Sequence, residues 1–226
     1  MKRFWKEVRT ATEADGSRVL LDGRPVTTPA KRPLLLPTPA LAEAVAAEWA
    51  ASGEQLRPDE MPLTQLCCTA LDLTLPREPA IRAQLAAYGG TDLLCHWAER
   101  PQALVERQER GWRPLLEWAA ARYGAPLAVT AGLMAVEQPP ESLEALAAAL
   151  EDYGDFALTA LAQLVQASGS LLLGLAVAEG RITPEEAFEA SELDATFQME
   201  LWGEDEEALA RRRALLADLT AAQRLL

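Results

Sequence analysis

Short apolar runs separated by turn residues fill the first part of the chain, a pattern typical of a small β-sheet. The runs lie at residues 4–8, 19–21, 25–27 and 34–36. Between the second and third runs stands Asp22-Gly23, a dipeptide that favours the positive φ angles of a tight hairpin. The pattern therefore predicts a small, mostly antiparallel sheet.

The next segment has helical spacing. Leu41, Val45 and Trp49 recur every fourth residue, which places them on one face of a helix over residues 40–51. Thr38 and Pro39 are a typical N-cap and first helical residue. We expect this helix to pack over the sheet.

Beyond a proline-containing break at residues 76–79, almost every segment has a helical pattern. Helices are expected at residues 62–73, 80–88, 104–123, 141–150, 156–178, from Thr183 onward, and 205–225. Thr183 and Glu186 match a capping box. The predicted fold class is α+β, with an N-terminal domain of a mostly antiparallel β-sheet and a packed helix (residues 1–78) and a C-terminal all-helical domain (residues 79–226).

Residues 156–178 carry no formal charge and are long enough to span a bilayer. However, the stretch contains glutamines, serines and glycines, and acids flank it without the basic cluster or aromatic belt of a membrane span. We interpret it as a helix buried among other helices. Gly169 lies in a group of small residues suited to close helix packing. A membrane-associated assembly factor is a less favoured hypothesis.

Composition and charge narrow the range of functions. The chain has 226 residues, of which 50% are hydrophobic and 24% charged, as in globular proteins. With 21 Lys and Arg against 34 Asp and Glu, its formal net charge is -13. Such a polyanion is repelled by phosphate backbones and anionic lipid headgroups, which argues against nucleic-acid binding. From this charge together with the pattern of residues 156–178, we also expect no membrane insertion.

Residues with catalytic or metal-binding chemistry are few. Cys67, Cys68, Cys95 and His96 do not have the spacing of a metal site, and no phosphate-binding loop or nucleophile elbow occurs. We therefore predict no cofactor, metal or catalytic residue. The cysteines suit buried thiols in a reducing compartment. The N-terminus lacks a secretory signal, so a bacterial-type cytoplasmic location is expected.

Acidic residues concentrate between residues 192 and 207. Asp194, Gln198 and Trp202 recur at four-residue steps and form one mixed polar and aromatic helical face. One interpretation is a solvated face followed by acids at a helix N-terminus. The other is a docking surface, in which acids select a basic or polar partner and Trp202 supplies contact area.

Many segments together resemble one family, the assembly chaperones that bind the alpha subunit of the ATP synthase catalytic head in mitochondria and alpha-proteobacteria. The segments, in chain order, are Arg3–Val8, Leu21–Val26, Thr28–Pro29, Ala47–Trp49, Met61–Thr64, Thr69–Asp72, Thr91–Cys95, Ala98–Pro101, Arg107–Gln108, Trp112–Ala119, Ser168–Leu171, and Leu193–Asp194 leading to Gln198, Glu200, Trp202 and Gly203. The resemblance covers nearly the whole length.

The resemblance implies two domains, no catalysis, and a role in holding the free alpha subunit until it meets a beta subunit. Asp194 occupies the position of a functionally important acid of the family, where many relatives carry Glu. We accordingly assign Asp194, Gln198, Glu200 and Trp202 to partner binding, and Trp5, Trp49 and Gly169 to structure. The free protein is expected to be monomeric. A small enzyme with a carboxylate pair between the domains is the main alternative.

Overall fold

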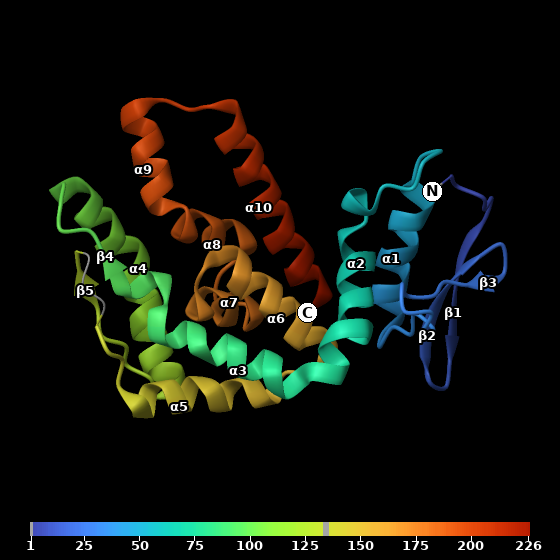
Figure 1. The fold of residues 1–226 in the computed structure, drawn as a ribbon, viewed down its shortest axis with the longest axis horizontal. Coiled ribbons are helices and arrows are strands. Elements are labelled where there is room, and N and C mark those ends of the chain that lie inside the picture. Colours follow the sequence, from blue (N-terminus) through green and yellow to red (C-terminus); the bar gives the residue numbers. More distant parts are fainter. Residues whose placement is uncertain (1, 133–135) are drawn as a thin grey trace. The chain divides into compact units, whose positions relative to one another are not determined.

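The computed structural model describes residues 2–132 and 136–226 and has an α+β fold, a small antiparallel sheet with many helices, as predicted (Figure 1). Its contacts divide the chain into two compact units. The first contains the residues up to Glu78 together with Asp155–Ala160 and Arg224–Leu226, and the second contains Pro79–Gly154 and Leu161–Gln223. The expected domains, 1–78 and 79–226, differ from these units by the two short later segments.

The sheet of the first unit has three antiparallel strands in the order β1-β2-β3: β1 (Val8–Glu13), β2 (Gly16–Leu21) and β3 (Arg24–Pro25). Alternate β2 residues point into the core, since Ser17, Val19 and Leu21 are buried. Asp22 and Gly23 join β2 to β3 with φ angles of 47° and 79°, which confirms the hairpin.

Two strand predictions were wrong. The first strand begins at Val8 and not at residue 4, because the Asp22 carboxylate accepts the backbone N–H groups of Lys6 and Glu7. Residues 34–36 form no strand: Leu36 makes an isolated bridge to Ser17, and the Leu34 N–H donates to the Val26 carbonyl oxygen at 3.1 Å. Prolines at 33 and 37 flank this segment and cannot donate to a ladder.

Helix α1 (Pro39–Ala51) starts where the cap predicts, with the Thr38 hydroxyl accepting the Leu41 N–H at 3.2 Å. Its apolar face enters the core of the first unit. That core consists of Trp5, Val19, Leu21, Val26, Leu34, Leu36, Leu41, Ala42, Val45, Trp49, Met61, Leu63, Cys67, Ala160 and Leu225. Burial of this face beside the sheet is the packing expected for the helix.

The proline-containing segment at residues 76–79 does not interrupt the helical path, contrary to expectation. Helix α2 (Pro62–Thr69) continues through a π turn at Ala70–Thr74 and a 3-10 turn at Leu75–Arg77 into α3 (Glu78–Tyr88). Pro79 is the second residue of α3, within the first helical turn, where no intrahelical N–H donor is required.

In the described residues of the second unit, helices predominate and the strands form a two-residue parallel pair. The further helices of the chain are α4 (Gln102–Tyr123), α5 (Pro140–Ala149), α6 (Asp155–Ser168), α7 (Leu171–Ala178), α8 (Pro184–Ser191), α9 (Leu193–Trp202) and α10 (Glu206–Leu225). The start of α6 and the end of α10 belong to the first unit, and the rest of these helices belong to the second. The pair joins β4 (His96–Trp97) to β5 (Thr130–Ala131). The irregular segment expected over residues 124–140 contains β5, and residues 133–135 lie outside the described residues.

The uncharged stretch at 156–178 was predicted as one helix but forms two. Gly169, with a φ of 71°, ends α6 in the left-handed conformation, and the Ser170 hydroxyl caps α7 by accepting the Leu173 N–H. Residues 171–177 are all buried. Within residues 2–132 and 136–226, no helix combines the length and apolarity needed to cross a bilayer.

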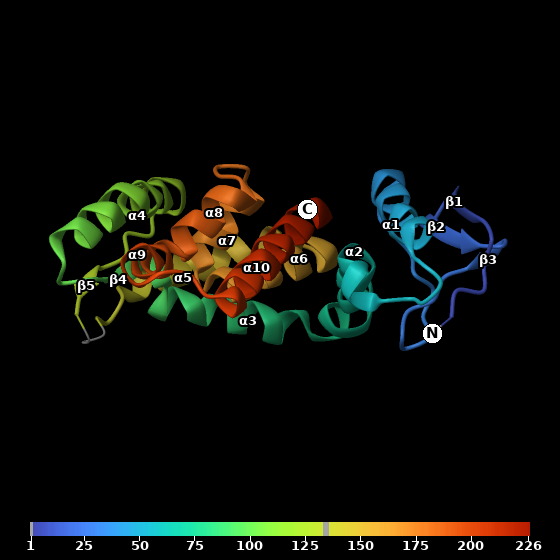
Figure 2. The same ribbon diagram turned by 90° about the horizontal axis from the view of Figure 1, so that it is seen from above.

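The segment from Thr183 is also two helices, α8 and α9, separated at Glu192. The capping box between Thr183 and Glu186 is confirmed. Because the chain turns at Glu192, Asp194 lies in the first turn of its own helix, and α9 packs against α4 (Figure 2).

Candidate partner-binding surface

Helix α9 packs against one face of α4. Trp112 is buried and its Nε1 donates to the Ala190 carbonyl oxygen at 2.9 Å, which holds the end of α8. Gly111 lies where a side chain would intrude, because an added Cβ would stand 3.3 Å from Leu193 Cδ1. The first residue of α9 can therefore approach the α4 backbone closely.

Asp194 is bound to α4 through a neutral amide. Its Oδ1 accepts a hydrogen bond from Gln108 Nε2 at 2.8 Å, and Gln108 Oε1 in turn accepts the Ala98 backbone N–H at 2.8 Å. Gln108 is fully buried, whereas Asp194 is exposed. Protein atoms around the Asp194 carboxyl displace water and raise its pKa, and the Gln108 hydrogen bond partly opposes this rise.

Glu200, almost two turns farther along α9, is neutralised within the protein. Arg107 donates to both of its carboxylate oxygens, at 2.8 and 2.6 Å, and stacks 5.1 Å from the centre of the Phe197 ring. The hydrogen bond from Arg107 lowers the pKa of Glu200, and Glu200 raises the pKa of Arg107. This pair fixes the C-terminal half of α9 to α4.

The C-terminal end of α9 is apolar and exposed. Leu201 is 59% exposed and Trp202 is 82% exposed, while Trp202 Nε1 donates to Gln198 Oε1 at 3.0 Å. Gly203, with a φ of 92°, follows directly. An exposed indole beside an exposed leucine is unusual on a surface that contacts only water, and it provides contact area for another molecule. We call Leu201 and Trp202 the apolar tip.

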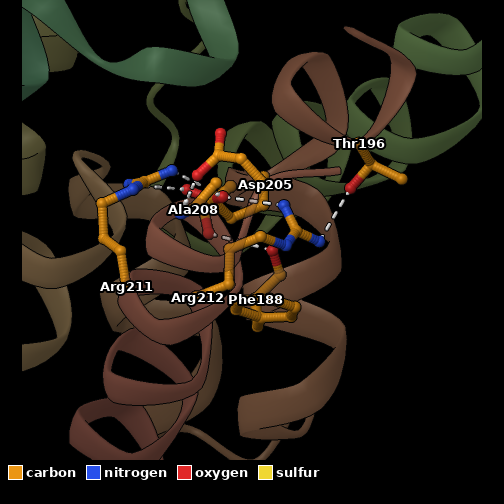
Figure 3. A network of polar contacts seen from close by, with 8 residues as sticks. Phe188, Thr196, Asp205, Ala208, Arg211 and Arg212 are labelled. Atoms are coloured by element: carbon orange, nitrogen blue, oxygen red, sulfur yellow. Dashed lines mark hydrogen bonds and ion pairs between the residues drawn. The ribbon is translucent and has the colours of Figure 1, made fainter. Parts of the chain in front are cut away.

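The α8–α9 junction is anchored to α10 by a buried acid. Glu192 is 7% exposed and pairs with Arg211 at 3.1 Å and Arg212 at 2.8 Å. Figure 3 shows Arg212 reaching the Thr196 hydroxyl, at 2.9 Å, with the Phe188 ring beside its guanidinium. Glu192 is therefore a structural anchor and not a surface acid of the docking face.

Sequence comparison adds independent information to this geometry. The profile described as ATP12 chaperone protein matches residues 2–120, which is more than half of the chain. The chain belongs to the ATP12 chaperone family. This membership confirms the resemblance stated for the sequence.

Several solved structures are closely similar to this one. The structure of Atp12 from Paracoccus denitrificans has a TM-score of 0.94 and 46% identity, covering 99% of this chain and 96% of that one. A form of that protein with an aspartate changed to lysine gives the same values. The Atu1473 protein of Agrobacterium tumefaciens has a TM-score of 0.95 and 41% identity, covering 99% of this chain and 84% of that one.

A eukaryotic ATP12 protein is a more distant relative. Protein atp12, mitochondrial, of Schizosaccharomyces pombe is 27% identical over 221 residues, covering 92% of this chain and 75% of that protein. The similarity thus extends over nearly the whole of this chain.

The four residues assigned to partner binding all lie on α9, but their surroundings differ. Trp202 and Gln198 contact each other at the apolar tip, and Glu200 and Asp194 are held by α4. The chemistry of α4 at this site was missed by reasoning from spacing, since Arg107 and Gln108 lie far from α9 in sequence. Their only signal was their occurrence among the segments that resemble ATP12 proteins.

The residues assigned to structure occupy other places in the ATP12 fold. Trp5 and Trp49 are buried in the core of the first unit, with ring centres 5.1 Å apart and edge-to-face. Gly169 forms the left-handed end of α6 in the second unit. Each of these positions is one where packing or backbone conformation restricts the residue type.

Cys67 and Cys95 are buried, as expected, whereas Cys68 is half-buried. Burial raises the pKa of Cys68 to about 11 and that of Cys95 to about 12, and Cys67 is shifted in the same direction. Few thiolates exist under such conditions at neutral pH, which makes these residues poor nucleophiles and ligands. Across the described part of the chain, no three His, Cys, Asp or Glu residues are grouped to hold a metal ion.

Proposed function

We propose that this ATP12 protein is a chaperone of ATP synthase assembly that binds the free alpha subunit of the catalytic head and prevents its aggregation until a beta subunit replaces it. It acts in the cytoplasm as a monomer, without a cofactor and without catalysis. Family membership supports the chaperone class, and the apolar tip of α9 beside an exposed carboxylate is the observation that supports a partner-binding surface.

The apolar tip suits a temporary cover for an apolar subunit interface. Burying a tryptophan side chain removes about 150–250 Å² from water, which stabilises a complex by about 4–6 kcal/mol before the costs of association. Those costs leave a modest net affinity, so a true partner with a larger interface can displace the chaperone. An apolar tip of only two residues therefore suits reversible binding of the alpha subunit.

The polar residues of α9 provide selection. Asp194 presents a negative charge that favours a basic or polar patch on the partner, and Gln198 holds the Trp202 indole in place. Glu200 belongs to the same helix, and its pairing with Arg107 holds α9 in position for the partner. Complementary charge at the rim of an apolar contact increases specificity and the association rate more than affinity.

The test is co-purification with separately expressed alpha and beta subunits. We expect retention of alpha alone, and light scattering should show less aggregation of alpha when the chaperone is present. Trp202→Ala and Asp194→Lys should each weaken capture by about tenfold or more, as hot-spot substitutions do, while the melting temperature stays close to that of the unmodified protein.

Val129→Ala is the matched control, because Val129 is another exposed apolar residue of the second unit, at 39% exposure, outside α9. It should leave capture unchanged. Equal retention of alpha and beta, or no retention of alpha, would contradict the proposal. Unfolding of the Trp202 and Asp194 variants would instead identify both residues as structural.

A further inference from the structure

We propose that Gln108 is a positioning residue for partner binding: it holds the Asp194 carboxylate in a fixed orientation while leaving its negative charge available to a basic side chain of the partner. This inference rests on the proposed function and adds a residue of α4 to the surface. It comes from the different ways in which the three acids between residues 192 and 202 are held, namely Glu192, Asp194 and Glu200.

Two of these acids are neutralised internally. Glu192 is paired with Arg211 and Arg212, and Glu200 is paired with Arg107 through two hydrogen bonds. In each pair the positive charge of arginine offsets that of the carboxylate, which weakens the attraction to a cation of another molecule. Both acids therefore serve to hold helices together.

Asp194 is held differently. Within the part of the chain that the structure describes, its carboxylate forms no ion pair and accepts a hydrogen bond from the Gln108 amide. A neutral amide donor orients a carboxylate without cancelling its charge. The exposed position of Asp194 leaves that charge within reach of another molecule.

The orientation of the Gln108 amide is determined by its second contact. The Ala98 backbone N–H can only donate, so the atom that it meets at 2.8 Å must be the amide oxygen, Oε1. The amide nitrogen then faces Asp194 and donates to it at 2.8 Å. Because Gln108 is fully buried in α4, this donor has little freedom to move.

The consequence is a preorganised anion at the first turn of α9. A carboxylate fixed before binding loses less conformational entropy when a guanidinium or ammonium group docks on it. Arginine, which can donate two parallel hydrogen bonds, is the basic side chain that benefits most. We therefore expect removal of the Gln108 donor to weaken binding only when Asp194 carries its charge.

The experiment measures the affinity of the full-length protein for purified alpha subunit by fluorescence anisotropy, in a double-mutant cycle. Gln108→Met retains side-chain length but removes both hydrogen bonds. It should weaken binding about tenfold, the usual effect of losing a hydrogen bond to a charged group. In an Asp194→Asn background the same substitution should change affinity less than about twofold, because its effect acts through the charge.

Gln102→Met is the matched control on the same helix. Gln102 is exposed, and its Nε2 donates to the Glu106 carboxylate at 3.2 Å, so the same neutral-donor contact is lost away from α9. Its affinity should equal that of the unmodified protein. If Gln108→Met does not fold, the affinity of Gln108→Glu is measured in its place. The glutamate can still accept the Ala98 N–H but repels Asp194, so it should also weaken binding.

The outcomes separate the two proposals. Failure of the unmodified protein to bind alpha overturns the proposed function, and this inference with it. If the unmodified protein binds and Asp194→Asn weakens binding, an unchanged affinity of the Gln108 variant overturns the inference alone. An equal loss in both backgrounds also overturns it, because that result indicates a general structural effect.

Discussion

Replacing Asp92 with alanine should destabilise the second unit more than removal of any exposed acid. Asp92 is completely buried, and its carboxylate accepts three hydrogen bonds: from the Ser170 hydroxyl at 2.7 Å and from the Leu94 and Leu172 backbone N–H groups at 3.0 Å each. It therefore connects the 3-10 turn at Leu93–Cys95 to the N-terminus of α7.

The magnitude follows from the donors that the substitution would leave unsatisfied. A buried donor without an acceptor costs about 1–3 kcal/mol. The Ser170 hydroxyl can rotate toward another acceptor, but the two backbone donors cannot. Burial raises the pKa of Asp92 while its hydrogen bonds lower it, so the cost of burying the carboxylate offsets part of its contribution. A net loss of about 3–5 kcal/mol is expected, a large share of the usual stability of a domain.

Urea unfolding followed by far-UV circular dichroism measures this loss. Asp205→Ala is the matched control, because Asp205 also accepts a helix N-terminal N–H, from Ala208 at 2.8 Å, but is exposed. Loss of such a cap costs about 1 kcal/mol. A loss for Asp92→Ala no larger than that of the control would refute the reasoning that burial makes these hydrogen bonds valuable.

Two further predictions concern helix packing and pH. Gly174→Ala should destabilise the protein by about 1–3 kcal/mol, because its Cβ would stand 2.6 Å from Val165 Cγ2. The control is Gly154→Ala, whose Cβ would meet nothing within 4 Å and whose stability should be near that of the unmodified protein. Equal urea midpoints for the two variants would contradict this prediction. Because Arg107 lowers the pKa of Glu200, their pairing stabilises the fold above the ordinary glutamate range and is lost as pH falls through that lowered pKa. The melting temperature of Glu200→Gln should therefore fall below that of the unmodified protein at neutral pH and match it in acid; a constant difference would exclude the pair as its cause.

Features encoded by neighbouring residues were predictable from the sequence. The Asp22-Gly23 hairpin, the Thr38 cap and the Thr183 capping box each depend on residues within a few positions of one another, and all three form. Their partners are set by backbone geometry alone, so no knowledge of the tertiary structure is needed.

Helix breaks that depend on distant partners were not predictable in this way. The chain turns at Gly169 and Ser170 in part because Asp92, 78 residues earlier than Ser170, accepts the hydroxyl and an N–H of the next helix. The turn at Glu192 is stabilised by arginines of α10 in the same manner. Periodicity reports only that such a stretch is apolar or helical.

The contacts of the candidate site also join residues that are far apart in the sequence. The sequence pattern identified Asp194 and Trp202 through their spacing on one helical face. The partner atoms of Glu200 come from a residue 93 positions earlier, and those of Asp194 from one 86 positions earlier. No local pattern relates such pairs, so only the fold distinguishes an acid that is compensated from one that is not.

The exposed indole also gives the protein an intrinsic optical reporter. Of its six tryptophans, Trp5, Trp49, Trp97 and Trp112 are buried and Trp118 is partly so, which leaves Trp202 as the one open to solvent. A soluble quencher added to the native protein would dim chiefly that emission. Any molecule that settles on the end of α9 would shield it, so occupancy could be followed without attaching a dye.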